Sequence, residues 1–300
     1  MGHVIKGKDE AIELSLIALI AGGHVLVDDI PGVGKTTLAR SLARSLDASF
    51  QRMQFTADLL PGDVTGVSIW NEATRAFEFH PGPIFHSIVL ADEINRASPK
   101  TQSALLEAMN EAQVTVDGVS HPLPRPFLVI ATQNPQEHAG TFPLPESQLD
   151  RFLLCFEMGY PSAEAERAIL AQSHGSTDVD ALSPVLHADD ILVLQADCNK
   201  VRVEDSLIDY LQRLAAASRT SELLALGVSP RGALALRRAG QARALLHGRD
   251  YATPDDFKRL AVPVFAHRVQ LKENFAHGGS ARQAAERVIE SLLSDVAVPR

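Results

Sequence analysis

A predicted strand, a glycine-rich loop and a predicted helix follow one another near the start of the chain, and this order constrains the fold more than any other feature. The apolar run Val25–Val27 precedes the loop PGVGKTT, residues 31–37, and leucines at every fourth position follow it. Such an order places the amino end of a helix, with its partial positive charge, behind the loop. The sequence therefore predicts an anion-binding loop in an α/β fold. The alternative is a Gly/Pro turn that precedes a helix by chance.

The loop fits the phosphate-binding pattern GxxxxGK[ST] except at its first position, which is Asp29. Two glycines let the backbone N–H groups point at phosphate oxygens, Lys35 places a cation on the β and γ phosphates, and the Thr36 hydroxyl can ligate Mg²⁺. A carboxylate would repel phosphates, so we expect the Asp29 side chain to point away from them. The predicted cradle for ATP consists of Gly32, Val33, Gly34, Lys35, Thr36 and Thr37.

Short apolar runs alternate with helical patterns in the first half of the chain, which predicts a parallel sheet covered by helices. After residue 160 the pattern contains helices only. We expect an α/β domain over residues 1–160 and a small all-α domain over residues 161–300. The predicted strands are His24–Asp28, Phe50–Phe55, Ser87–Ala91, Phe127–Thr132 and Phe152–Met158.

The composition is that of an ordinary globular protein, with 45% hydrophobic and 22% charged residues. The net charge of −9 argues against a surface that binds nucleic acid as a whole, although a local basic groove stays possible. The two cysteines have no metal-ligand spacing, and the most apolar stretch, residues 11–27, is too polar for a membrane helix. It also lacks the basic n-region and the small-residue cleavage site of a signal peptide. These features indicate a cytoplasmic protein.

Two carboxylates stand at the end of the buried run 88–91. An acid at such a strand end can hold the Mg²⁺ shell, and we assign this role to Asp92. Glu93 would then polarise the attacking water. Asn134, after the next buried run, can orient that water or sense the γ-phosphate. The alternatives are an exposed pair of acids at a strand end and an Asn-Pro turn.

Two arginines complete the predicted set. Arg151 directly precedes the fifth strand. Arg231 lies in the first turn of a helix that Ser229 would cap, a position where the helix dipole disfavours a cation by roughly 0.3–1 kcal/mol. An incoming γ-phosphate would offset this cost, which favours a functional reading of Arg231. Surface arginines on a solvated face are the alternative for both.

Long strings beyond the phosphate loop resemble one family. The chain is similar to MoxR-family AAA+ ATPases over nearly its whole length, and this family commonly has an acidic residue at the position of Asp29. The strings that carry the resemblance are AGGH (21–24), QFT (54–56), ADEINRA (91–97), TQSALLEAM (101–109), ATQNP (131–135) and LPESQLDRF (144–152).

The resemblance implies an AAA+ core with sheet order 5-1-4-3-2, a helical lid and assembly into a ring, usually a hexamer. Arg151 would be the arginine finger that acts on the neighbouring subunit's ATP, Asn134 would be sensor 1, and Arg231 would be sensor 2. A segment near the adenine would contain Val4, Ile5 and Gly7.

The resemblance also implies two protrusions that contact partners. The candidate helix-2 insert covers residues 60–85, and a hairpin before sensor 1 covers residues 113–126 and turns at Asp117-Gly118. Inert surface hairpins are the alternative.

Family membership implies Mg²⁺-dependent ATP hydrolysis by a chaperone-like motor. Its partners would be a client protein and a protein with a von Willebrand factor A domain, in protein maturation or metal-cofactor insertion. A magnesium-chelatase-like motor subunit and a nucleic-acid-stimulated AAA+ motor are the alternatives. A third is a nucleotide-binding scaffold without hydrolysis, which the presence of Glu93 and Arg151 disfavours.

Overall fold

A computed structural model describes residues 1–135, 140–171, 179–272 and 281–299. The chain divides into two compact units that interleave along the sequence. The α/β unit contains Met1–Ser15, His24–Leu144 and Phe156–Leu192, and the helical unit contains Leu16–Gly23, Pro145–Cys155 and Val193–Arg300. The predicted domain boundary near residue 160 stays a prediction.

A five-stranded sheet forms the centre of the α/β fold. Its strands are β1 (Val25–Asp28), β2 (Phe50–Gln54), β5 (Ile88–Asp92), β8 (Leu128–Gln133) and β9 (Leu154–Phe156). Their order is β2-β5-β8-β1-β9, and β2 pairs with β5, β5 with β8 and β8 with β1 in parallel. Counted along the chain, this is the order 5-1-4-3-2, so the predicted sheet order is confirmed.

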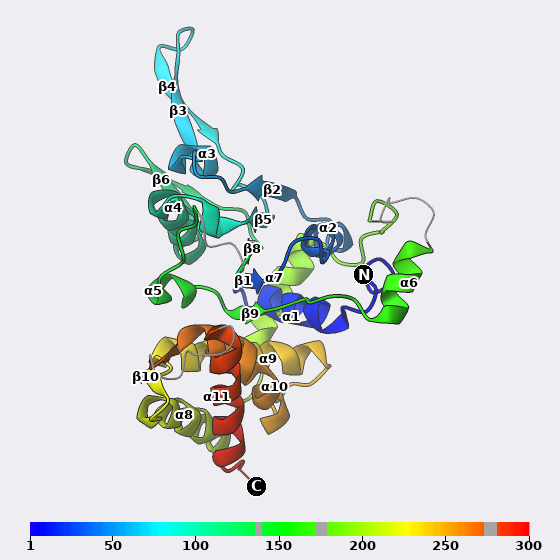
Figure 1. The fold of residues 1–300 in the computed structure, drawn as a ribbon. Coiled ribbons are helices and arrows are strands. Elements are labelled where there is room, and N and C mark those ends of the chain that lie inside the picture. Colours follow the sequence, from blue (N-terminus) through cyan, green and yellow to red (C-terminus); the bar gives the residue numbers. More distant parts are fainter. Residues whose placement is uncertain (136–139, 172–178, 273–280, 300) are drawn as a thin grey trace. The chain divides into compact units, whose positions relative to one another are not determined.

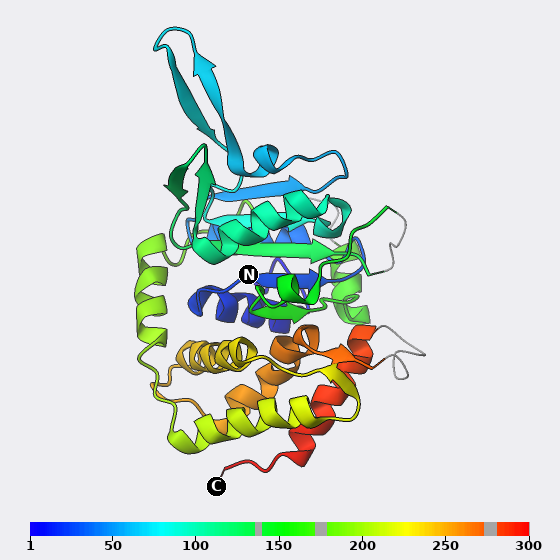
Figure 2. The same cartoon turned by 90° about the vertical axis from the view of Figure 1, so that its left-hand side faces the viewer.

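Each of the five predicted strands is present, and β9 is the one most shortened relative to its prediction. The inner strands read as unbroken apolar runs because both of their faces are buried. All five residues of β5, for example, are buried. Figures 1 and 2 show α2 (Lys35–Ser45) and α4 (Pro99–Glu111) on opposite faces of this sheet.

Two hairpins extend from the α/β unit (Figures 1 and 2). The longer one pairs β3 (Gly66–Asn71) with β4 (Ala76–Pro81) and follows the short helix α3 (Pro61–Thr65). The other pairs β6 (Gln113–Val116) with β7 (Val119–Pro122). It turns at Asp117 and Gly118, whose φ angles of 51° and 79° are those of a two-residue hairpin turn. Both predicted hairpins are therefore present.

Helices make up most of the second unit. Its largest are α8 (Asp205–Thr220), α9 (Pro230–Leu246), α10 (Pro254–Phe265) and α11 (Ala281–Asp295). The shorter elements are α5 (Glu146–Leu149), β10 (Leu224–Leu226), η2 (Ala266–Arg268) and β11 (Gln270–Leu271). Thr253 and Asp256 form a capping box at the start of α10, as the sequence pattern indicates.

Three further helices and one turn complete the described elements. They are α1 (Asp9–Ile20), α6 (Ala163–Leu170), α7 (Ala188–Cys198) and η1 (Ile94–Arg96). No helix within the described ranges is long and apolar enough to cross a membrane.

Candidate phosphate-binding site

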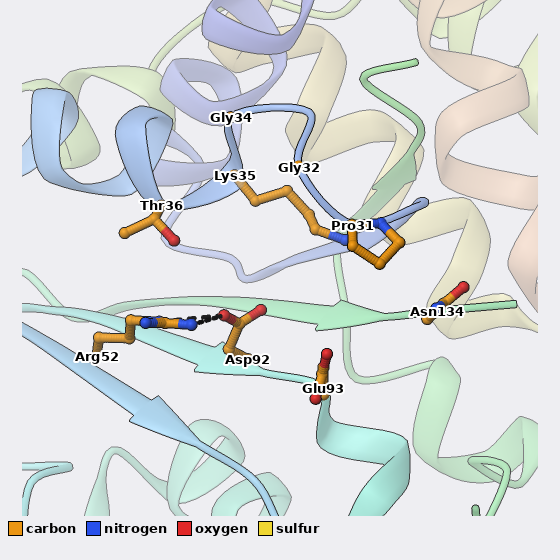
Figure 3. Close-up of a pocket in the computed structure, with 9 residues that line it drawn as sticks. All are labelled: Pro31, Gly32, Gly34, Lys35, Thr36, Arg52, Asp92, Glu93 and Asn134. Carbon is orange, nitrogen blue, oxygen red and sulfur yellow. Dashed lines mark hydrogen bonds and ion pairs between the residues drawn. The ribbon is translucent and has the colours of Figure 1, made fainter. Parts of the chain in front are cut away.

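Three parallel strands and one loop end at the same edge of the sheet and enclose a pocket of about 350 Å³. Such an edge, at the carboxyl ends of parallel strands, is where open α/β sheets bind ligands. Nine residues line the pocket (Figure 3): Pro31, Gly32, Gly34, Lys35, Thr36, Arg52, Asp92, Glu93 and Asn134.

The loop between β1 and α2 has the conformation that a phosphate cradle needs. Gly32 and Gly34 have φ angles of 85° and 98°, which side chains rarely adopt, and no atom lies within 4 Å of where a Cβ would stand. Gly34 caps α2 without a side-chain hydrogen bond. The first N–H groups of α2 therefore face an anion site instead of a capping side chain.

Figure 3 shows the side chain of Lys35 reaching across the loop towards Pro31. Its Nζ donates a hydrogen bond of 2.7 Å to the carbonyl oxygen of Asp29. Burial lowers the pKa of Lys35, and the nearby carboxylates of Asp29, Asp92, Asp28 and Glu93 oppose that shift. A single carbonyl leaves capacity on an ammonium group that has three donors. Phosphate oxygens can supply the remaining partners.

The side chain of Asp29 points away from this pocket, as we expected. It is 5% exposed. Its Oδ2 accepts hydrogen bonds from the backbone N–H groups of Met158 (2.6 Å) and Gly159 (2.7 Å), and its Oδ1 accepts one from Ile30 (2.8 Å). The aspartate that departs from the GxxxxGK[ST] pattern thus ties the loop to the segment at residues 158–159, and its side chain is not among those that line the pocket.

Asp92 and Glu93 both line the pocket, and the Thr132 hydroxyl forms a hydrogen bond with each of these residues. Asp92 Oδ1 accepts a hydrogen bond of 2.6 Å from the Thr132 hydroxyl, and that hydroxyl accepts one of 2.9 Å from the backbone N–H of Glu93. Glu93 has φ 57° and ψ 49°, a left-handed conformation that costs energy for a residue with a side chain. Strain of this kind is frequent at active sites, although turns and helix ends also contain it.

The pocket brings together seven of the fourteen residues predicted for the site. Buried Asn134, 6% exposed, follows β8 and lines it. Val33 is buried, and neither it nor Thr37 is a lining residue. The segment predicted near adenine also lies outside the lining set. A Cβ at Gly7 would lie 3.1 Å from Ala165, so this segment runs close to the start of α6.

The two predicted arginines belong to the helical unit. Arg151 follows α5, and within the described ranges its guanidinium has no hydrogen bond or ion pair. Arg231 is the second residue of α9, whose N-cap Ser229 accepts a hydrogen bond from Gly232 as predicted. Its Nε lies 3.8 Å from Asp150 Oδ2. Neither arginine is among the nine lining residues.

Arg52 and Gln54 were not predicted as site residues. Both lie on β2, two positions apart, so their side chains share one face of the sheet. Arg52 forms an ion pair with Asp92, and Gln54 Nε2 donates a hydrogen bond of 2.7 Å to Glu93 Oε2. Arg96 also contacts that oxygen, at 3.0 Å. Two polar residues at alternate positions of an edge strand were the only signal in the sequence.

The residues present fit a bound Mg²⁺-nucleotide. Carboxylate and hydroxyl oxygens are the ligands that Mg²⁺ prefers, together with phosphate oxygens. Asp92 and Thr36 supply such oxygens on opposite sides of one pocket (Figure 3). Lys35 and the start of α2 supply positive charge for phosphates on the same side as Thr36.

Comparisons with known proteins agree with this geometry. A family model for the ATPase family associated with various cellular activities (AAA) matches residues 24–154, and one for the AAA lid domain matches residues 216–290. The uncharacterized protein YeaC of Bacillus subtilis is 51% identical over 299 residues, which cover 100% of this chain and 92% of that protein.

Two further matches have lower identity and similar coverage. Chaperone MoxR1 of Mycobacterium tuberculosis is 40% identical over 307 residues, which cover 99% of this chain and 80% of that protein. A crystal structure of a Cytophaga hutchinsonii protein has a TM-score of 0.90 and 38% identity, and the match covers 100% of this chain and 92% of that one. On this sequence and structural evidence, the chain belongs to the MoxR family of AAA+ ATPases.

Proposed function

We propose that this protein hydrolyses ATP in a Mg²⁺-dependent reaction and uses the energy as a chaperone-like remodelling motor. The observation that carries the proposal is that one pocket is lined by the phosphate loop, by the acids Asp92 and Glu93 at the end of β5, and by Asn134. Membership of an ATPase family supports the reaction, and the name of the relative Chaperone MoxR1 supports the biological role.

The phosphate loop and the lining residues Asp92, Glu93 and Asn134 have chemical tasks in this proposal. The N–H groups of the loop and Lys35 bind the phosphates and stabilise the charge that develops on them. Thr36 and Asp92 would hold Mg²⁺, which would supply positive charge against that of the phosphates. Glu93 orients the attacking water and accepts its proton, and Asn134 fixes the position of the same water or of the γ-phosphate.

Arg151 and Arg231 act in this proposal on a nucleotide of an assembled ring, usually a hexamer. Arg151 has no side-chain partner within the described part of its own chain, which supports a role on a neighbouring subunit's ATP. Arg231 lies at the amino end of α9, where a phosphate would offset the unfavourable helix dipole. Val4, Ile5 and Gly7 contact the adenine.

The two hairpins serve as contact surfaces for partners in this proposal. Trp70 and Phe77 pack edge to face, with centroids 5.3 Å apart, and their exposed fractions are 50% and 70%. Exposed aromatic pairs of this kind mark interaction sites. We propose a client protein and a protein with a von Willebrand factor A domain as the partners, and a cytoplasmic location.

Two substitutions with matched controls test the hydrolytic function. Lys35→Ala removes the phosphate cation and is expected to abolish ATP binding, measured by titration calorimetry. Glu93→Gln is expected to bind ATP but to lower turnover by roughly 10²–10⁴-fold, the usual contribution of a general base. The controls are Lys100→Ala and Glu107→Gln, whose native side chains are exposed.

Retained ATP affinity in Lys35→Ala would contradict the assignment of the loop, and near-normal turnover in Glu93→Gln would move the base elsewhere. The Glu93→Gln protein is expected to stay in its ATP-bound state, so it also serves as the bait in a pull-down experiment for partner proteins. Capture of a von Willebrand factor A domain protein by this variant, but not by Lys35→Ala, would support the proposed partnership.

A further inference from the structure

The guanidinium of Arg52 forms an ion pair with Asp92, the carboxylate that we propose as a ligand of Mg²⁺. Arg52 Nη2 and Nε donate to Asp92 Oδ2 over 2.7 Å and 3.1 Å, shown by the dashed lines in Figure 3. The other oxygen, Oδ1, accepts from the Thr132 hydroxyl. Both oxygens of Asp92 are therefore engaged, one by a cation from the neighbouring strand.

The position of Arg52 follows from the register between two parallel strands. Arg52 pairs with Leu90, and Gln54 pairs with Asp92, so Arg52 reaches Asp92 diagonally across β2 and β5. Its Nη2 also donates to Gln54 Oε1 over 2.9 Å, which holds the guanidinium in this orientation. The Arg52 side chain is 49% exposed and that of Asp92 is 12% exposed. The arginine can therefore move into solvent while the carboxylate stays in place.

Charge balance decides which cation Asp92 holds. The lining residues carry two positive groups, Lys35 and Arg52, and two negative groups, Asp92 and Glu93. A divalent cation that enters the pocket alone must displace Arg52 and then adds its charge beside two other cations. A triphosphate brings several negative charges and further oxygen ligands, so it reverses this balance.

We propose that Arg52 makes Mg²⁺ binding conditional on the nucleotide, by holding Asp92 until phosphates arrive. Arg52 is thus a positioning residue that couples metal and nucleotide affinity. Coupling between two ligands is reciprocal. Arg52 therefore increases the effect of bound nucleotide on the metal affinity, and it increases the effect of bound metal on the nucleotide affinity by the same factor. This inference rests on the proposed role of Asp92 as a ligand of Mg²⁺.

Mn²⁺ binding, followed by electron paramagnetic resonance with and without ADP, tests the proposal in the 300-residue chain. Arg52→Gln is expected to bind Mn²⁺ without nucleotide at least tenfold more tightly than the unmodified protein, and the effect of ADP on Mn²⁺ affinity is expected to shrink by the same factor. The control is Arg202→Gln, because Arg202 forms an exposed ion pair with Asp250 at 3.5 Å. It is expected to bind Mn²⁺ as the unmodified protein does.

Two outcomes would overturn the proposal. The first is an Arg52→Gln protein whose Mn²⁺ affinity without nucleotide lies within twofold of the unmodified value. The second is a tenfold loss of metal-free ADP affinity with unchanged Mn²⁺ binding, which would make Arg52 a phosphate ligand. Arg52→Lys keeps the charge but loses the two-point contact, so an intermediate Mn²⁺ affinity is expected, and this variant replaces Arg52→Gln if the latter fails to fold.

Asp92→Asn separates failure of this inference from failure of the proposed function. If Asp92→Asn binds Mn²⁺ in the presence of ADP as well as the unmodified protein does, Asp92 is not a metal ligand and the proposed site itself is wrong. If Asp92→Asn loses Mn²⁺ and Arg52→Gln does not change it, the site stands and only the role of Arg52 is wrong.

Discussion

The helical unit and the α/β unit both bury charged side chains, and they satisfy them in different ways. In the helical unit, Asp256 is fully buried and accepts hydrogen bonds from Arg243, from both Nη atoms of Arg249 and from the N–H and hydroxyl of Thr253. In the α/β unit, Lys35 has one hydrogen-bond partner, the carbonyl oxygen of Asp29. Asp92 forms an ion pair with Arg52, whose side chain is half-exposed.

The difference separates charges that stabilise the fold from charges that await a ligand. A buried carboxylate with every lone pair engaged has no capacity for another partner, and removing it leaves buried cations unpaired. Lys35 and Asp92 have partners that a ligand can replace. The number and mobility of the partners of a buried charge therefore indicate its role better than its burial does.

Arg151→Ala gives the largest expected effect, because Arg151 is proposed to act on ATP directly and has no side-chain partner in the described part of its own chain. We expect ATP binding to persist while turnover falls by roughly 10³-fold or more, as for arginine fingers that act in trans. The control is Arg259→Ala, at an exposed arginine of the same unit. Steady-state phosphate release measures the effect.

Mixing separates action in trans from action within one subunit. Subunits with Arg151→Ala keep Glu93, and subunits with Glu93→Gln keep Arg151, so a mixed ring contains complete sites. Recovery of turnover on mixing is expected. No recovery would leave the interface role without support.

Asp256→Ala is expected to lower the free energy of unfolding by roughly 3–5 kcal/mol, because it leaves Arg243 and Arg249 without their buried partner. Chemical denaturation followed by circular dichroism measures the loss. The control is the adjacent, exposed Asp255→Ala. Equal stability of the two variants would contradict the contrast between the units.

The same carboxylate has a pH signature. Burial alone would raise the pKa of Asp256, but hydrogen bonds from Arg249, Thr253 and Arg243 outweigh it and lower the pKa to about 2. Its contribution to stability is therefore complete above the ordinary aspartate pKa of about 4 and is lost as the pH falls towards 2.

His24 is expected to make the α/β unit less stable at mildly acidic pH. Burial lowers the pKa of His24 to about 4, although the hydrogen bond to the Met109 carbonyl opposes the shift. Its Nδ1 accepts from the N–H of Val129 and has no room for a proton. Between about pH 6.5 and 4 the unfolded chain takes up a proton that the folded chain refuses, which costs about 3 kcal/mol.

Unfolding free energies measured from pH 7 to pH 4 test this linkage. The His24→Gln variant is expected to have a flatter pH dependence by one proton, whatever its stability at pH 7. An unchanged slope would show that His24 does not titrate as expected.

Asp29→Ala has the smallest expected effect and tests where this carboxylate acts. It leaves the N–H groups of Met158 and Gly159 without their acceptor, so a stability loss of roughly 1–3 kcal/mol is expected. ATP affinity is expected to change less than tenfold. Asp29→Asn, which keeps one acceptor oxygen, should lose less stability. A tenfold or greater gain in ATP affinity in Asp29→Gly would mean that the carboxylate does repel the phosphates.

Much of the fold could be predicted from local patterns, and the errors have physical causes. Apolar runs predicted the buried strands β1, β5 and β8, because strands buried on both faces have few alternatives. In α8 the apolar residue Ile208 lies next to the buried stripe in the sequence, but its side chain is 40% exposed, and Tyr210 is fully buried. Leu207, Leu211 and Leu214 define the buried face. Ile208 follows Leu207 directly and therefore points about 100° away from it.

The sequence by itself determined the phosphate loop, the two acids at the end of β5 and the order of the elements. The reason is that spacing along one strand, loop or helix dictates the directions in which neighbouring side chains point. Only the tertiary structure decided the partners of these groups. The N–H groups that donate to Asp29 belong to Met158 and Gly159, which lie 129 and 130 residues further along the chain. Arg52 lies 40 residues before Asp92. Such contacts depend on strand order and register, which bring distant residues together and which no local pattern encodes.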